Sequence, residues 1–165
     1  MDRTMTTTHA PLNARRRMLI WLPALLAVGL VLLIVAGLAT TVEDWSRDLS
    51  RNRAETRDDH PDPRLRPVRS RQSPAELADQ VVAAAGELRG WRLEERLENG
   101  DAIELHLTRT TPLWRFVDDI RATIRPAENE TELRAVSQSR VGKGDLGQNP
   151  RNLRELLDKL RAGGS

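Results

Sequence analysis

The chain has 165 residues, with 26 Lys and Arg against 24 Asp and Glu, so its formal net charge is only +2. Residues 1–42 hold four Arg and one Asp, a net +3, which leaves −1 for the rest of the chain and disfavours the clustered positive surface that nucleic-acid binding requires. The absence of Cys excludes disulfides, thiolate nucleophiles and Cys-ligated metals.

The first predicted element is an apolar segment from Met18 to Val42, 25 residues without a charge. About 20 apolar residues suffice to cross a bilayer, so we expect one transmembrane helix over residues 18–42. Arg15-Arg16-Arg17 precedes it, and the positive-inside rule makes residues 1–17 a cytoplasmic tail and places the C-terminal domain outside the cytoplasm, at the cell membrane. A cleavable signal peptide cut after Ala39 and a twin-arginine export signal remain alternatives, although the apolar run exceeds the usual signal core of about 7–15 residues.

Residues 43–72 follow as a predicted charged linker. Residues 46–72 contain eight Arg, four Asp and one Glu, with Pro61, Pro63 and Pro67 and few apolar side chains. Such a segment buries too little surface to offset the entropy of ordering it, so we expect a solvated stalk before a folded domain at residues 73–165.

The domain is predicted to begin with a helix and a β-hairpin. Ser73-Pro74-Ala75-Glu76 combines an N-cap, a proline at the first helical position and a capping box, and a helical apolar period follows as far as Gly90. Residues 91–97 alternate as a half-buried strand, with Trp91, Leu93 and Leu97 on one face. After a tight turn at residues 98–101, a second strand places His106 on its polar face, as a solvated residue rather than a general base.

A second hairpin and a final helix complete the predicted fold. Residues 115–125 and 130–141 form two strands joined by a four-residue loop, in a register that sets Asp118 opposite Ser137 and Phe116 opposite Ser139, all facing inward. Asn149 caps the last helix, whose buried stripe is Leu153, Leu156, Leu157 and Leu160. The order α-β-β-β-β-α predicts an α+β fold, a four-stranded antiparallel sheet with two helices on one face, preceded by the transmembrane helix.

The most densely specified part of the sequence lies between the last strand and the last helix. It reads Ser137-Gln-Ser139-Arg140-Val-Gly142-Lys143-Gly144-Asp145-Leu-Gly147-Gln-Asn149-Pro150. Its glycines have the spacing G-x-G-x-x-G, but the helix opens only at Asn149 and no further strand follows, so a dinucleotide site is not expected. No Ser or Thr follows Lys143, which removes a P-loop as well, and no cofactor is predicted.

Three interpretations of this loop stay open. In a structural one, glycines supply positive φ angles, Asp145 bonds loop amides, and Arg140 pairs with Asp118 or Asp119. In a binding one, loop N–H groups and the helix N-terminus form an anion site with Arg140 and Lys143. In a catalytic one, Asp118, Asp119 and Asp145 form a carboxylate cluster for acid–base chemistry or a divalent cation. A transition-metal site is not predicted, because the chain has neither Cys nor a His pair at ligand spacing.

Phe116-Val-Asp118-Asp119-Ile120, followed by the run from Ser137 to Asn149, resembles the signature of the domain-of-unknown-function family 1499, over about residues 60–162. The resemblance implies a small α+β domain, often exported or membrane-attached, and no established activity. Val136 and Asn152 stand where an Arg is common in the family, and the loss of these two cations weakens the interpretation of the loop as an anion site. Residues 60–70 also lack the paired cysteines of many members. The matching positions are Phe116, Asp118, Asp119, Ser137, Ser139, Arg140, Gly142, Asp145, Gly147 and Asn149.

Together these patterns predict a single-pass membrane protein whose exported domain is a non-catalytic binding or interaction module. The alternative is a hydrolytic or metal-assisted enzyme built on Asp118, Asp119 and Asp145. Beside the membrane, the expected partner is a protein or a small anion at residues 142–149, with no nucleic acid. The candidate binding residues are Arg140, Gly142, Lys143, Gly144, Asp145, Gly147, Asn149, Asp118, Asp119, Ser137 and Ser139.

Overall fold

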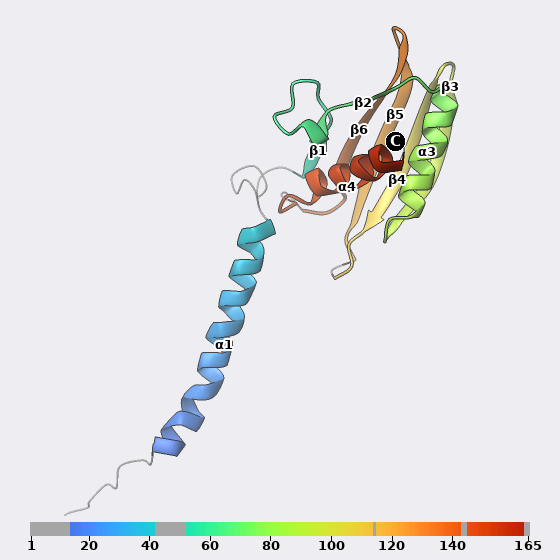
Figure 1. Cartoon of the computed structure of the whole chain (residues 1–165). Helices are drawn as coiled ribbons and strands as arrows, with labels where there is room; N and C mark the ends of the chain where they lie inside the picture. Colours follow the sequence, from blue (N-terminus) through green and yellow to red (C-terminus); the bar gives the residue numbers. More distant parts are fainter. Residues whose placement is uncertain (1–13, 42–51, 114, 143–144, 164–165) are drawn as a thin grey trace, which may run out of the picture. The chain divides into compact units, whose positions relative to one another are not determined.

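The computed structural model describes residues 14–41, 52–113, 115–142 and 145–163, and the chain divides into two compact units at Thr41 (Figure 1). The first unit contains helix α1, Ala14–Thr41, which has Pro23 inside it. Nearly all of its described side chains, residues 21–37, are exposed. Within the described residues, no helix combines the length and the apolar character needed to span a membrane. The transmembrane helix at residues 18–42 stays a prediction.

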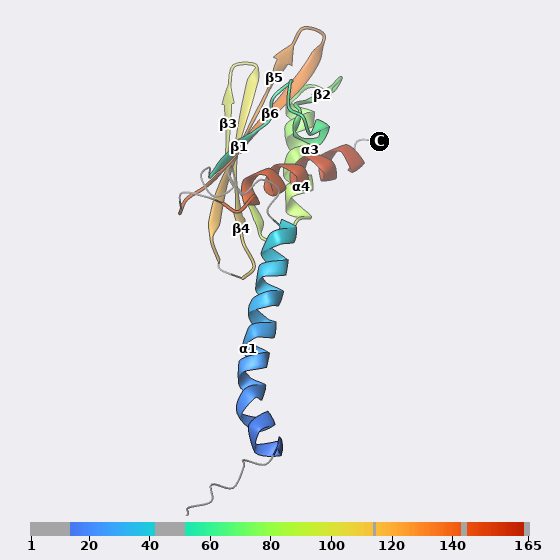
Figure 2. The ribbon, with the colours of Figure 1, turned by 90° about the vertical axis from the view of Figure 1, so that its left-hand side faces the viewer.

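The second unit is built on a six-stranded antiparallel sheet (Figures 1 and 2). The strand order is β1-β6-β5-β4-β3, and β2 also pairs with β6, so β1 and β2 follow one another along the same edge. The α+β class is confirmed, but the sheet has two strands more than the predicted four. The strands are β1 Arg53–Glu55, β2 Val68–Ser70, β3 Trp91–Asn99, β4 Ala102–Thr110, β5 Val117–Ala127 and β6 Glu130–Ser139.

Both additional strands come from the segment that was expected to be a solvated stalk, and that expectation is wrong for residues 52–70. Leu65, in the short 3-10 helix η1, Pro63–Leu65, is only 2% exposed and belongs to the core. Charges of this segment pair with the last helix, since Asp62 accepts a hydrogen bond from Arg154 Nε at 2.7 Å and Arg64 donates to Asp158. From composition these charges are expected to be hydrated, but in the structure side chains of the last helix pair with them.

Two helices, α3 Pro74–Gly86 and α4 Gln148–Gly163, cover one face of the sheet (Figure 2). The predicted capping box is confirmed, since the Ser73 hydroxyl accepts from the backbone N–H of Glu76 and the Glu76 carboxylate accepts from that of Ser73. The leucine stripe of α4 is also confirmed. The helices and the inner sheet face enclose one core, whose fully buried large apolar side chains are Leu65, Leu77, Val81, Leu105, Leu107, Ile120, Ile124, Leu133, Leu153, Leu156 and Leu157.

Strand β3 contains a bulge that the sequence pattern did not predict. Its pairing with β4 shifts between Leu93 and Glu95, so Leu97 lies opposite Glu104 on the outer face, the face without helices, and is 44% exposed. An extra residue in a strand sends every later side chain to the opposite face. The expectation that Trp91, Leu93 and Leu97 share the inner face is therefore wrong for Leu97.

The β5–β6 hairpin is tighter than predicted. Ala127 pairs with Glu130 around a turn at Glu128 and Asn129, where Glu128 has a φ of 51°. The register is therefore two residues away from the predicted one, with Asp118 opposite Ser139 rather than Ser137. A shift of two keeps each side chain on its face, so the inward position of Asp118 is confirmed.

Candidate functional site

The loop between β6 and α4 is organised around the carboxylate of Asp145. Asp145 Oδ1 accepts the backbone N–H of Gly147 at 2.9 Å and Oδ2 accepts that of Asn149 at 2.8 Å. The carboxylate satisfies the N–H of Asn149, which lies in the first turn of the helix and has no carbonyl partner there, and it complements the positive end of the helix dipole. Helix α4 accordingly begins at Gln148, so the prediction that Asn149 caps it is wrong.

Two glycines of the loop have backbone angles that other residues rarely adopt. Gly142 has a φ of 97° and Gly147 a φ of 75°, both in the left-handed region that glycine adopts without strain. Lys143 and Gly144, which were predicted to contribute to an anion site, lie outside the described residues.

Asn149 instead anchors a buried polar network between α4 and the sheet. Its Oδ1 accepts from the Ser137 hydroxyl at 2.6 Å, and its Nδ2 donates to Ser139 Oγ at 3.1 Å and to the backbone carbonyl of Asn52 at 2.7 Å. The Asn149 and Ser137 side chains are fully buried, and Ser139 is 9% exposed. The predicted residues Ser137, Ser139 and Asn149 thus do meet, in a closed interior.

Asp118 belongs to the same network and is 1% exposed. Asn152 Nδ2 donates to Asp118 Oδ2 at 2.8 Å and lies 3.2 Å from Ser137 Oγ. In the sequence Asn152 stands out only as a departure from a family pattern. Asn52 is not predicted to take part at all, yet its side chain donates to the carbonyl of Gly142 at 2.8 Å and so ties the chain before β1 to the loop. Neither asparagine stands in a periodic pattern that could have marked it.

Asp119 points to the outer face and makes a separate cluster there. Arg140 donates to it through both Nε and Nη2, each at 2.8 Å, and His106 Nε2 lies 2.8 Å from its Oδ1. The hydrogen bonds from Arg140, opposed in part by desolvation, lower the pKa of Asp119 to about 2. Of the two predicted partners for Arg140, the structure selects Asp119. His106 lies on the polar face as predicted, but it is paired rather than simply solvated.

These positions bear on the chemistry proposed from sequence. Asp118 and Asp119 are adjacent in a strand and face opposite sides of the sheet, while Asp145 is bonded to the amides of its own loop, so the three carboxylates do not converge. Among the described residues, no group of three or more acidic or His side chains is placed to hold a metal ion. The amides of Gly147 and Asn149 already bind the Asp145 carboxylate, so they are not available to an external anion.

Phe116 was predicted to face inward with Asp118, and that prediction is wrong. It precedes β5 and is 53% exposed. Its N–H donates to Thr111 Oγ1 at 2.9 Å, and Arg115 before it has a φ of 57°, so the backbone turns before the strand alternation begins.

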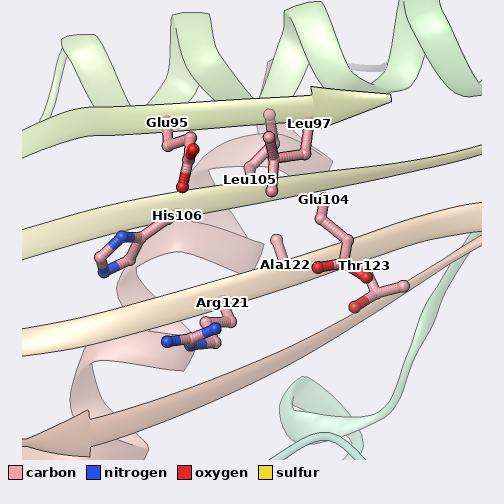
Figure 3. Close-up of a pocket in the computed structure, with 8 residues that line it drawn as sticks. All are labelled: Glu95, Leu97, Glu104, Leu105, His106, Arg121, Ala122 and Thr123. Carbon is pink, nitrogen blue, oxygen red and sulfur yellow. The ribbon is translucent and has the colours of Figure 1, made fainter. Parts of the chain in front are cut away.

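The outer face carries a small hollow over the middle of β3, β4 and β5 (Figure 3). Exposed Leu97 lines the hollow together with acidic and basic side chains of β3, β4 and β5. The residues that line the hollow are Glu95, Leu97, Glu104, Leu105, His106, Arg121, Ala122 and Thr123.

A second ionic cluster on the outer face surrounds Glu132, whose side chain is 4% exposed. Arg134, Arg125 and Arg69 donate to its two oxygens at distances from 2.9 to 3.4 Å. The hydrogen bonds from Arg134 and Arg125, which outweigh desolvation, lower the pKa of Glu132. Asp58, from the segment between β1 and η1, joins the cluster through Arg134 and Arg69.

Residues 42–160 match the family described as "Protein of unknown function (DUF1499)". No curated protein matches the chain.

Proposed function

The chain belongs to the DUF1499 family, and from that premise we propose that it is a membrane-anchored protein whose domain, residues 52–163, is a non-catalytic interaction module. The proposed binding surface is the outer face of β3 to β6, centred on the hollow beside Leu97, and the proposed partner is another protein of the envelope. The observation that carries this proposal is the bulge in β3, which places an apolar side chain on the face that no described helix covers.

The outer face has the chemistry of an interaction surface. Leu97 offers an apolar centre, and Glu95, Glu104 and Arg121 around it offer charges of both signs. Protein interfaces combine an apolar centre with a polar rim in this way. Asp119 and Glu132 form ion pairs that hold nearby arginines in fixed positions in the unbound protein. Because these side chains are already ordered, less conformational entropy is lost when a partner binds.

The motif residues support a scaffold role rather than catalysis. Asp118 is buried and hydrogen-bonded to Asn152, and the Asp145 carboxylate is hydrogen-bonded to backbone amides at the start of α4. A general acid or base must reach a substrate proton, which neither of these carboxylates does. The enzyme alternative therefore has no converging residues to support it among those that the structure describes.

The proposed anchor is helix α1. It covers most of the uncharged run Met18–Val42, and its described side chains between Trp21 and Val35 are apolar and largely exposed. An uncharged segment of this length is long enough to span a bilayer. Arg15-Arg16-Arg17 before the run supports a cytoplasmic N-terminus and an extracytoplasmic domain at the cell membrane. Resistance of the full chain to carbonate extraction tests the anchor.

Crosslinking in native membranes followed by co-purification tests the interaction. Leu97→Arg is the informative variant, because it places a charge at the centre of the surface without touching the core. Asn129→Arg is the matched control, since it adds the same charge on the exposed β5–β6 turn. We expect Leu97→Arg to lose a partner that wild type and the control both retain. Equal recovery from all three proteins, at equal abundance, contradicts the proposed surface.

A further inference from the structure

We infer that the domain pairs with a second copy of itself through the free edge of β3, in an antiparallel register centred on Leu97. The inference goes beyond the proposed function, because it assigns an occupant to the edge of the sheet and not to its outer face. The paired segment is residues 95–99, the regular part of β3 between its bulge and the turn into β4. Two copies joined in this way share one continuous sheet.

Strand β3 is the last strand in the sheet order, at the edge away from β1 and β2. Antiparallel neighbours alternate between hydrogen-bonded pairs and pairs whose N–H and C=O groups point away from one another. Thr110 N–H donates to the Gly90 carbonyl at 2.8 Å, which makes the even-numbered residues of β4 the hydrogen-bonded positions. Arg96 and Glu98 pair with odd-numbered residues of β4, so their backbone groups point to the free edge. No hydrogen bond of the described residues joins these groups to another element.

A second copy related by a two-fold axis at Leu97 satisfies these backbone groups. Arg96 of each copy then lies opposite Glu98 of the other, and both pairs exchange two backbone hydrogen bonds. Leu97 lies opposite its own counterpart at a position without cross-strand hydrogen bonds, where Cα atoms approach to about 4.5 Å and side chains pack most closely. The two exposed Leu97 side chains thus form one apolar contact on the outer side of the joined sheet.

Charge complementarity selects this register and a second copy as the occupant. The two-fold registers that bring edge-facing backbone groups together are centred on Arg96, Leu97 or Glu98. A centre at Arg96 or Glu98 sets like charges opposite one another, which destabilises a strand pair, whereas a centre at Leu97 sets opposite charges together twice. This register also uses the whole of residues 95–99, while a shift in either direction meets the bulge or the turn. An unrelated peptide strand gains the same backbone hydrogen bonds but not the matched charges.

Arg96 also has a buried donor at this edge. Its Nη1 donates to Asp79 of α3 at 2.6 Å, and its Nε lies 3.3 Å from Glu98 Oε1 of the same strand. That Nε is nevertheless buried and donates no hydrogen bond within the described residues, which is unfavourable for a charged group. Glu98 of the second copy brings an accepting carboxylate to the cross-strand position opposite Arg96.

The helix beside the edge leaves room for the second copy. Asp79 faces the edge, since it binds Arg96, and Ala83 and Gly86 follow it on the same side of α3 at helical spacing. Both are exposed, and a Cβ added at Gly86 meets no atom within 4 Å. Small residues at these positions let the α3 helices of two copies lie beside one another over the joined sheet, because the distance between packed helices depends on the side chains at their contact.

The absence of Cys makes the register testable by disulfide trapping in the full chain. Leu97→Cys places two thiols opposite one another with Cα atoms about 4.5 Å apart, within the range that a disulfide spans. Glu95→Cys and Asn99→Cys lie opposite one another only when the two proteins are coexpressed. Asn129→Cys, at the exposed β5–β6 turn, is the matched control.

We expect mild oxidation to convert Leu97→Cys to a reducible dimer at least about tenfold faster than the control, because pairing raises the effective thiol concentration. Glu95→Cys and Asn99→Cys should each match the control alone and form a dimer when coexpressed. A Leu97→Cys protein that oxidises no faster than the control overturns the inference. A Leu97→Cys dimer without the mixed dimer overturns it as well, in favour of contact through the outer faces.

Charge reversal gives a second measurement, by sedimentation equilibrium of the full chain in detergent. Arg96→Glu and Glu98→Arg each set like charges opposite one another twice, so each should weaken self-association at least about tenfold. A mixture of the two variants restores opposite charges in both pairs and should recover the wild-type affinity, while Asn129→Arg should not change it. A wild-type chain that remains monomeric overturns the inference. Unchanged association of Glu98→Arg, which leaves the bond between Arg96 and Asp79 in place, overturns it even if Arg96→Glu does not fold.

Discussion

Asn149→Ala tests whether the motif holds the fold together. The substitution removes three side-chain hydrogen bonds, to Ser137, Ser139 and the Asn52 carbonyl, from a residue that is fully buried. Each such bond contributes about 1 kcal/mol net, and a single buried partner left unpaired raises its own cost to as much as about 3 kcal/mol. We therefore expect a loss of about 3–5 kcal/mol in the free energy of unfolding.

That loss is a large share of the roughly 5–15 kcal/mol that stabilises a typical domain. It corresponds to a fall in Tm of about 10–20 °C for a domain of this size. Urea unfolding of the full chain in detergent, followed by circular dichroism, measures the change as a lower midpoint at an unchanged slope. Asn129→Ala, on the exposed turn, is the control and should change stability by less than about 0.5 kcal/mol. If Asn149→Ala costs no more than this control, the structural account of the motif is refuted.

Three further predictions concern other parts of the domain. The pKa of Asp119, lowered to about 2, means that its ion pair stabilises the fold above the unfolded pKa near 3.9 and that this stabilisation is lost as pH falls toward 2. Allowing for the partial exposure of the pair, Asp119→Asn should lower the free energy of unfolding by about 1–2 kcal/mol at pH 7. A difference from wild type that persists undiminished at pH 2 would argue against this ion pair as the cause. Gly90 has a φ of 84°, and a Cβ there would lie 2.6 Å from the Thr110 carbonyl oxygen, so Gly90→Ala should lower stability by about 2 kcal/mol or more in thermal melts, whereas Gly86→Ala, in open space within α3, should not. Glu132→Gln leaves three guanidinium groups around a neutral amide, so the variant should melt at a lower temperature than wild type at neutral pH. The two melting temperatures should approach one another in acid, where wild-type Glu132 is itself protonated. A difference in melting temperature that stays constant with pH would contradict this.

The parts of the fold that could be predicted from sequence depend on local chemistry. The capping box at Ser73 and the leucine stripe of α4 need only residues within a few positions of one another. The opposite directions of Asp118 and Asp119 follow from strand alternation alone, so the separation of the carboxylates could have been derived before the structure.

The parts that were missed depend on distant partners. Strands β1 and β2 are three residues each, and their pairing with β6 is not encoded in any apolar alternation of their own. The bulge in β3 changes the face of Leu97 through the register with β4, which single-strand periodicity does not contain. Asn52 and Asn152 matter because of what they bond across the fold, and a lone asparagine in a sequence carries no such mark.

The central claim is that a partner binds the outer sheet face while the motif serves the interior, and photocrosslinking in native membranes tests it most directly. Benzoylphenylalanine is placed in the full chain at Leu97, at Val141 within the motif loop, and at Asn129 as the control, and all three positions are exposed. The account predicts a discrete protein adduct from position 97 and no protein adduct from positions 141 and 129. An adduct from position 141 without one from position 97 would contradict it.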